Sequence, residues 1–581
     1  MSTSLRASSG PVRLTALAFA AITSLSAFAA PVALHPDTPV AGAAHLITSS
    51  PGTFTGVDVA TLIGANRYYS AGITGQNTVV ANVEAGHIWN GHESLRHVSN
   101  FVNHASTFQT VAGQPEYDRH ATWVGMMIGG RSGAGTTNGP WQAGIAPGTD
   151  LRSGAIATSF VGSAYALNFG ASVQSLATAY AGHFGTADVV NSSWGGTDPG
   201  GTSVRATIPD GLAFQNRNTL FVSSAGNSGP SPGTVGSPGT GYNGITVGAL
   251  QNVGNVYNTV AGFSSRGPMP FQFADGRAVL GVRAAVDIVA PGTTLTSAFY
   301  GGQTGGNNPT LAGSTDFPGT NLYSGGVGGT SFAAPIVAGG AALMISASRQ
   351  DAELAGNDNA RDARVIKSAL LNSADKIPGW SNGQVLVDGI VTTTQSLDWT
   401  SGAGAMNLSR AYDQHLAAGT RDVAGTEGGA VRATGWDYGV ATMGNTWMYE
   451  ITDALLGGSF LTVTLDWYRE RRFDAATLLA EEIGQANLDL YVYDLDLDTI
   501  VARSISTYNN TEHLHFALGS TSRYAIGVHY AGNLFGDIGR AAYGLSWFGT
   551  AAPAGVPLPG SLVLVLLGLA LLGSRRRAAA R

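Results

Sequence analysis

The chain contains no cysteine among its 581 residues. Without thiols it cannot form a disulfide, a thiol nucleophile or a cysteine-ligated zinc site. Charge is also scarce, because Asp, Glu, Lys and Arg make up only 12% of the residues and the formal net charge is −7. Basic residues cluster only near the two ends, so we expect no nucleic-acid partner. These absences exclude thiol chemistry and polyanion binding.

What the sequence has in abundance is apolar residues, at 44%, and glycine, at 81 residues. A chain of this length and apolar content can bury a sizeable core and form more than one domain. High glycine with low charge is typical of loop-rich globular folds and not of coiled coils or acidic disordered segments. We therefore expect a folded, globular protein.

The amino-terminal segment has the features of an export signal. Arg6 and Arg13 precede the apolar stretch LTALAFAAITSLSAFA, which ends on the small-residue pattern Ala27-Phe28-Ala29. This order predicts a signal peptide over residues 1–29, with an uncleaved anchor as the alternative, followed by an amino-terminal extension over 30–56.

The carboxy-terminal segment is a second apolar run, VPLPGSLVLVLLGLALLGSRRR (556–577). Its length is near the roughly 20 residues that span a bilayer, and its arginines would remain cytoplasmic. The arrangement resembles PEP-CTERM sorting tails, although Leu558 stands where that motif has glutamate. Residues 556–581 are therefore predicted to lie in the membrane as an anchor or to be recognised by a sorting enzyme. Both interpretations place the body of the protein in the cell envelope or outside the cell.

Between the ends, two patterns follow one another. Residues 57–417 alternate near-continuous Val- and Ile-rich runs with Ala-rich helical segments, which favours an α/β, doubly wound, mostly parallel sheet with its chemistry at the carboxyl ends of the strands. The predicted strands are 79–83, 188–192, 219–225, 244–250 and 286–290, and the predicted helices are 120–130, 331–348 and 363–374. Residues 420–548 alternate apolar and polar side chains, as in 460–468, 488–496 and 523–531, and this predicts a β-sandwich.

The stretch GGTSFAAPIVAGG (328–340) places Ser331 in the first turn of a predicted helix. There the hydroxyl and the backbone N–H lie at the positive end of the helix dipole. A helix N-cap is the alternative role for such a serine. The stretch GTSFAAP also resembles the nucleophile motif of the subtilisin-like serine proteases.

Further segments resemble the same family in the same order. RHATWVGMMIGG (119–130) is similar to its histidine helix, with His120 in the catalytic position, although Ala121, Trp123 and Met126 depart from the motif. SSAGNSG (223–229) is similar to the segment that supplies an oxyanion-hole amide, here Asn227. VNSSWGG (190–196) resembles the substrate-binding edge strand. The resemblance implies that Ser193, Trp194 and Gly195 bind an extended peptide.

The third triad member is the point at which this sequence departs most from the family. VVANVEAG (79–86) resembles the strand that carries the catalytic aspartate, but Glu84 stands at that position. We expect Glu84 to orient His120 with reduced turnover, since its carboxylate lies one methylene further from the backbone. Asp118, two residues before His120, is the rival acid. The related sedolisin branch also uses glutamate, but in a Ser-Glu-Asp set. The presence of His120 argues against assigning this chain to that branch.

No metal ligand is assigned, and the implied chemistry requires no cofactor. The resemblance implies calcium as an optional ligand, yet the loop HESLRH (92–97) offers only Glu93 where an aspartate is usual. DLDLD (494–498) with Asp489 offers carboxylates for a hard cation, or else forms a polar strand edge.

The sequence therefore predicts an exported serine endopeptidase that acts on protein or peptide substrates. Glu84, His120 and Ser331 would form the triad, and Asn227 the oxyanion hole. The alternative from another class is a catalytically silent protein of the same fold that binds partners at the cell surface.

Overall fold

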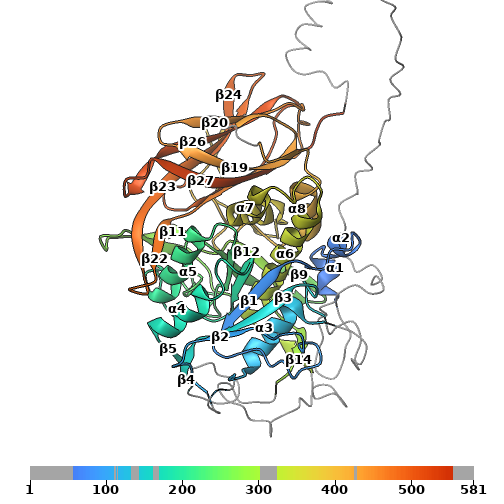
Figure 1. The fold of residues 1–581 in the computed structure, drawn as a ribbon. Coiled ribbons are helices and arrows are strands. Elements are labelled where there is room, and N and C mark those ends of the chain that lie inside the picture. The colour runs from blue at the N-terminus through green and yellow to red at the C-terminus, as the bar shows by residue number, and fades with distance from the viewer. Residues whose placement is uncertain are drawn as a thin grey trace, which may run out of the picture. The chain divides into compact units, whose positions relative to one another are not determined.

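A computed structural model of the protein describes residues 57–109, 113, 115–131, 143–160, 169–300, 323–423 and 428–553. The predicted signal peptide, amino-terminal extension and carboxy-terminal tail lie outside these residues. Figure 1 shows the earlier strands and helices in blue to yellow and the later strands in orange.

The first sheet is built from near-continuous apolar runs that are buried on both faces. Seven parallel strands follow the order β12-β8-β7-β6-β1-β3-β2, and β9 pairs antiparallel with β8. The five strands predicted from sequence are β1, β6, β7, β8 and β12, and all are confirmed. The bounds are β1 Val79–Glu84, β2 Phe101–Asn103, β3 Asp150–Ala155, β6 Val189–Ser192, β7 Leu220–Ser224, β8 Ile245–Val253, β9 Val256–Val260 and β12 Ile288–Pro291.

Helices cover this sheet on both faces. The helices α3, α6, α7 and α8 share one hydrophobic cluster with one face of the strands, and α4 and α5 share another with the opposite face. The doubly wound prediction is therefore confirmed, and the three predicted helices correspond to α3, α6 and α7. The bounds are α3 Arg119–Gly129, α4 Val173–Ala181, α5 Val204–Gln215, α6 Thr330–Gln350, α7 Ala363–Ser373 and α8 Leu408–His415.

Shorter elements complete the first part of the chain: α1 Val59–Leu62, α2 Asn66–Tyr69, η3 Asp358–Arg361, and the two-stranded pairs β4 Ala157–Phe160 with β5 Phe169–Ala171, β10 Met269–Gln272 with β11 Ala278–Arg283, and β13 Leu295–Ala298 with β14 Tyr323–Val327. Among the described residues, α6 alone has the length and apolar composition of a membrane span. Its residues from Thr330 to Ser348 are buried inside the protein, and it is the core helix of the first sheet.

The later strands form two further sheets that enclose a second hydrophobic core. The predicted β-rich region after the doubly wound part is therefore confirmed, and the predicted strands correspond to β21, β23 and β26. One sheet has the order β15-β16-β24-β23-β26-β20-β18, with β22 paired to β23, and the other has the order β17-β19-β27-β21-β25. The bounds are β15 Val385–Val387, β16 Ile390–Thr393, β17 Thr420–Arg421, β18 Gly428–Val431, β19 Thr434–Thr442, β20 Thr446–Ile451, β21 Phe460–Trp467, β22 Glu470–Asp474, β23 Leu479–Asp494, β24 Thr499–Ser504, β25 Thr511–Ala517, β26 Tyr524–Phe535 and β27 Arg540–Phe548.

The two parts share elements across the predicted boundary near residue 420. The strand β16 precedes that boundary but pairs with β24 of the sandwich. The buried ring of Trp436 in β19 stacks on His415 of α8 and belongs to the core of the first sheet. The boundary itself stays a prediction, but the sandwich is packed against the α/β part through core side chains.

Candidate active site

Three predicted site segments follow the carboxyl ends of neighbouring strands. Glu84 is the last residue of β1, Ser193 comes directly after β6, and Asn227 lies three residues beyond β7. Because β1, β6 and β7 are adjacent and parallel, their carboxyl ends meet at one edge of the sheet. The helices α3 and α6, which carry His120 and Ser331, pack against each other at the same sheet.

Glu84 and His120 are joined by a direct hydrogen bond. The Glu84 Oε2 atom lies 2.9 Å from Nδ1 of His120, and Oε1 accepts the backbone N–H of Ser193 at 2.7 Å. The Glu84 side chain is 0% exposed, so both carboxylate oxygens are satisfied inside the protein. The longer glutamate side chain therefore reaches the imidazole from the end of β1.

The imidazole of His120 is placed to exchange a proton. Burial disfavours its charged form, but the charge and hydrogen bond of Glu84, with the nearby charge of Asp118, outweigh burial and raise the His120 pKa above its ordinary value of 6.5. Since Nδ1 faces the carboxylate, the neutral ring carries its proton there and leaves Nε2 as the basic nitrogen.

Asp118 serves the backbone of α3. It is the N-cap of this helix, and its Oδ2 atom accepts the N–H of Ala121 at 3.1 Å. Burial is the main cause that raises the Asp118 pKa. Of the two candidate acids, Glu84 is the one that the structure hydrogen-bonds to His120.

Ser331 lies in the first turn of α6 and is 8% exposed. Its hydroxyl donates to the carbonyl oxygen of Ser193 at 2.8 Å. The next residue, Phe332, has its ring centroid 5.9 Å from that of His120. The structure thus brings the serine and histidine segments side by side, with the hydroxyl bound to the edge segment.

The side-chain amide of Asn227 is oriented by Thr330. Its Oδ1 atom accepts the Thr330 backbone N–H at 2.9 Å and the Thr330 hydroxyl at 3.0 Å. This arrangement fixes the amide so that its NH₂ group remains as the donor. Sequence reasoning missed this function of Thr330, although its place directly before Ser331 in the GTS motif was the available signal.

The predicted substrate-binding residues differ in exposure. Trp194 is 5% exposed, and its Nε1 atom donates to the carbonyl of Val83 at 3.0 Å. It forms a buried wall, whereas Gly195 is exposed. The backbone N–H and carbonyl of Ser193 bind Glu84 and Ser331. A peptide-binding function of Ser193, Trp194 and Gly195 stays a prediction.

Several carboxylates predicted as optional calcium ligands have protein partners. Among the described residues, no three His, Cys, Asp or Glu side chains form a group that could hold a metal ion. Glu93 accepts a hydrogen bond from the Tyr323 hydroxyl, while Asp494 binds Ser522 and Asp496 pairs with Arg523. These three carboxylates are engaged by protein donors, and calcium as an optional ligand stays a prediction.

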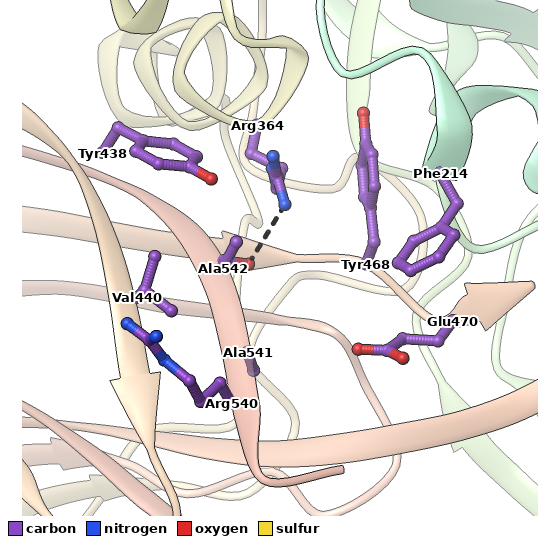
Figure 2. A pocket seen from close by; sticks show the side chains of 9 residues that line it. All are labelled: Phe214, Arg364, Tyr438, Val440, Tyr468, Glu470, Arg540, Ala541 and Ala542. Carbon is purple, nitrogen blue, oxygen red and sulfur yellow. Dashed lines mark hydrogen bonds between the residues drawn. The ribbon is translucent and has the colours of Figure 1, made fainter.

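A cavity of about 390 Å³ lies where the sandwich meets α5 and α7. Figure 2 shows Arg364 between Tyr438 and Tyr468, with a hydrogen bond to the carbonyl of Ala542. The charge of Arg364 is neutralised by Asp362 at 2.8 Å. None of the predicted site residues lines this cavity, whose walls are Phe214, Arg364, Tyr438, Val440, Tyr468, Glu470, Arg540, Ala541 and Ala542.

The chain is similar to several subtilisins over part of its length. A subtilisin of Bacillus sp. strain TA39 is 35% identical over 169 residues, which cover 29% of this chain and 37% of the relative. Subtilisin E of Bacillus subtilis strain 168 is 28% identical over 288 residues, covering 49% of this chain and 59% of the relative. The chain therefore spans less than two thirds of either relative.

Solved structures and a family model were also matched. The solved structure of Sphericase is 22% identical with a TM-score of 0.37, covering 57% of this chain and 93% of that one. Residues 56–404 match the family described as Subtilase family, and this match confirms the predicted subtilisin-like fold. Since it covers more than half of the chain, the chain belongs to the subtilase family of serine proteases.

Proposed function

We propose that this protein is an exported serine endopeptidase that cleaves protein or peptide substrates through an acyl-enzyme. The observation that carries the proposal is the 2.9 Å hydrogen bond between buried Glu84 and His120, beside the helix start that bears Ser331. This arrangement supplies a nucleophile, a base and an orienting acid on three separate elements.

The first step transfers a proton from Ser331 to His120. The hydroxyl leaves the carbonyl of Ser193, turns toward Nε2 of His120 and attacks the carbonyl carbon of the scissile peptide bond. Its proton passes to Nε2, and Glu84 stabilises the imidazolium that results. The Asn227 amide and the Ser331 N–H donate hydrogen bonds to the oxyanion.

The second half of the reaction regenerates the serine. The imidazolium gives its proton to the departing amine as the carbon–nitrogen bond breaks, and an ester to Ser331 remains. His120 then takes a proton from water as the water oxygen attacks the ester carbon. The acyl–oxygen bond breaks, the imidazolium returns the proton to the Ser331 oxygen, and the new carboxyl product leaves. Only protein groups and water take part, so the proposed reaction requires no cofactor.

The location of the reaction follows from the predicted signal peptide. Export would place the enzyme in the cell envelope or outside the cell, with the tail over 556–581 anchored in the membrane or processed by a sorting enzyme.

Hydrolysis of a denatured protein tests this function. The full chain is incubated with the substrate, and new amino termini are mapped by mass spectrometry beside Ser331→Ala as the matched control. We expect defined cleavage sites that disappear with the substitution. Folded protein without Ser331-dependent cleavage would instead favour the catalytically silent binding protein.

A further inference from the structure

The strands β22 and β23 form a hairpin (residues 470–484) that leaves the sandwich and packs on α5. The contact is close, because a Cβ atom at Gly211 would lie 2.8 Å from the backbone nitrogen of Phe473. The Phe473 N–H also donates to the side chain of Gln215 at 3.0 Å. Figure 2 shows Phe214 of α5 beside Tyr468 and Glu470, at the base of this hairpin.

The hairpin contributes a side chain to the core behind the predicted substrate edge. Phe473 is 7% exposed and belongs to the hydrophobic cluster that contains Trp194 and Val83. The other buried members of this cluster come from the α/β part, and Leu478 of the hairpin also packs against it. The wall behind the edge segment is therefore completed by the sandwich.

Arg471 carries the charge contact of the hairpin. It is 0% exposed, and its Nη1 atom binds Oδ2 of Asp210 in α5 at 2.7 Å, while Nη2 forms an ion pair with Glu482 at 2.6 Å. Asp210 is itself 1% exposed. A carboxylate this deeply buried requires a counter-charge, and Arg471 supplies it from a position 261 residues away.

Asp210 in turn holds a turn of the backbone. Its two oxygens accept the N–H groups of Tyr242 and Asn243 at 2.8 and 3.0 Å. The side-chain amide of Asn243 also exchanges two hydrogen bonds of 2.8 Å with the backbone of Arg469 in the sandwich. One end of the segment 237–243 is therefore fixed jointly by α5 and the sandwich.

The other end of this segment binds the predicted substrate edge. Ser237 and Gly196 exchange backbone hydrogen bonds of 2.8 and 2.9 Å. Gly196 directly follows Gly195, and the edge returns to Glu84 through the N–H of Ser193. A short series of bonded groups thus joins the hairpin to the edge segment 193–196.

We propose that the β22–β23 hairpin positions the substrate-binding edge of the peptidase site, with Arg471 as the positioning residue. This inference rests on the proposed function and deepens it: the sandwich is retained in the active enzyme and controls the binding of extended peptides. The nucleophile and base stand on α6 and α3, so a displacement of the hairpin should affect peptide binding at the edge more than the chemical step at Ser331.

The test compares Arg471→Met with Arg523→Met in the full chain. Arg523 is the matched control, because it pairs with Asp496 on the sandwich surface with its side chain 53% exposed. Active sites are titrated with a fluorophosphonate, and kinetics are expressed per titrated site. For Arg471→Met we expect KM for an extended peptide to rise about 10- to 100-fold, because a small displacement of a binding edge has effects of this size. The rate of labelling by the small probe should change much less than KM, because the probe does not pair with the edge.

Hydrogen exchange supplies a readout that does not depend on activity. In Arg471→Met we expect the amides of residues 196 and 237 to lose protection, while those of α3 keep it. Gly211→Ala displaces the hairpin without removing a charge. If Arg471→Met does not fold, we expect Gly211→Ala to show the same rise in KM and the same loss of protection, again compared with Arg523→Met.

Three outcomes would overturn the inference. They are an unchanged KM with unchanged protection, an equal fall in labelling rate and peptide affinity, or the same changes in Arg523→Met. Wild-type protein that is never labelled contradicts the proposed function instead, and the exchange data then still decide whether the hairpin holds the edge.

Discussion

Two buried carboxylates in this protein have similar environments and different partners. Glu84 at the end of β1 and Asp210 in α5 are 0% and 1% exposed. Glu84 accepts one backbone N–H group and Asp210 accepts two, and each binds one basic side chain. For Glu84 that side chain is the imidazole of His120, whereas for Asp210 it is the guanidinium of Arg471.

The difference lies in whether the partner can lose its proton. An imidazole titrates near neutral pH, so the pair at Glu84 can accept a proton and return it. A guanidinium keeps its charge under all conditions in which the protein is folded, so the pair at Asp210 can only hold its surroundings in place. One arrangement of a buried carboxylate thus serves chemistry in one region and positioning in another.

The largest effect is expected from removing the titratable partner. In His120→Ala the Ser331 hydroxyl loses its base, and kcat should fall about 10⁶-fold. Progress curves on a peptide substrate measure it. A loss no greater than that caused by Arg471→Met would remove the distinction between the two regions.

The next effect concerns the carboxylate of the catalytic pair. Glu84→Gln keeps the size of the side chain but presents an amide to Nδ1, which disfavours the required tautomer, so kcat should fall about 10⁴-fold. Asp118→Asn is the matched control and should lose much less, since an asparagine can still cap α3. If the rate collapses only in Asp118→Asn, Glu84 is not the orienting acid.

Breaking the positioning pair should appear as lost stability. Arg471→Met leaves the Asp210 carboxylate buried without its counter-charge, and we expect the free energy of unfolding to fall by about 3 to 5 kcal/mol. Urea denaturation measures this change. Adding Asp210→Asn to the same chain removes both charges and should restore part of the loss. A double variant less stable than the single one would contradict this account of the pair.

A smaller loss is expected at the oxyanion donor. Asn227→Ala removes the amide that Thr330 orients, and kcat should fall about 10²- to 10³-fold with little change in KM. Steady-state kinetics on one peptide separate the two parameters. A rise in KM at constant kcat would assign Asn227 to substrate binding instead.

The smallest effect is a shift in pH dependence. Catalysis needs neutral His120, and its pKa is raised above 6.5, so kcat/KM should fall as the pH drops through that raised value. Asp118→Asn removes one of the charges that raise this pKa, and the acid limb should therefore move to lower pH. In Arg471→Met the limb should stay in place. If the acid limb of the pH profile moved in both variants, the charges of the Asp210 pair would influence the pKa of His120, contrary to this account.

The sequence carried much of the fold and the candidate catalytic set, for a physical reason. Parallel strands buried on both faces require continuous apolar runs, so β1, β6, β7, β8 and β12 were recognisable. The candidate catalytic residues lie in short motifs, because each must be held at a strand end, a turn or a helix start. They are Glu84, His120, Asn227 and Ser331.

The positioning pair had no comparable signal. Asp210 and Arg471 are 261 residues apart and meet only through tertiary packing. Asp210 lies in a helix between Pro209 and Gly211, and the close approach of Phe473 and Ala480 in the hairpin explains the glycine. A contact that depends on two separate parts of a fold leaves no local pattern.

Covalent labelling tests the central claim most directly. The folded full chain is treated with a fluorophosphonate, digested, and mapped by mass spectrometry, with Ser331→Ala and His120→Ala in parallel. The account predicts one adduct per chain on Ser331, absent in the first variant and formed far more slowly in the second. Folded protein that takes up no adduct, or an adduct on another residue, would contradict it.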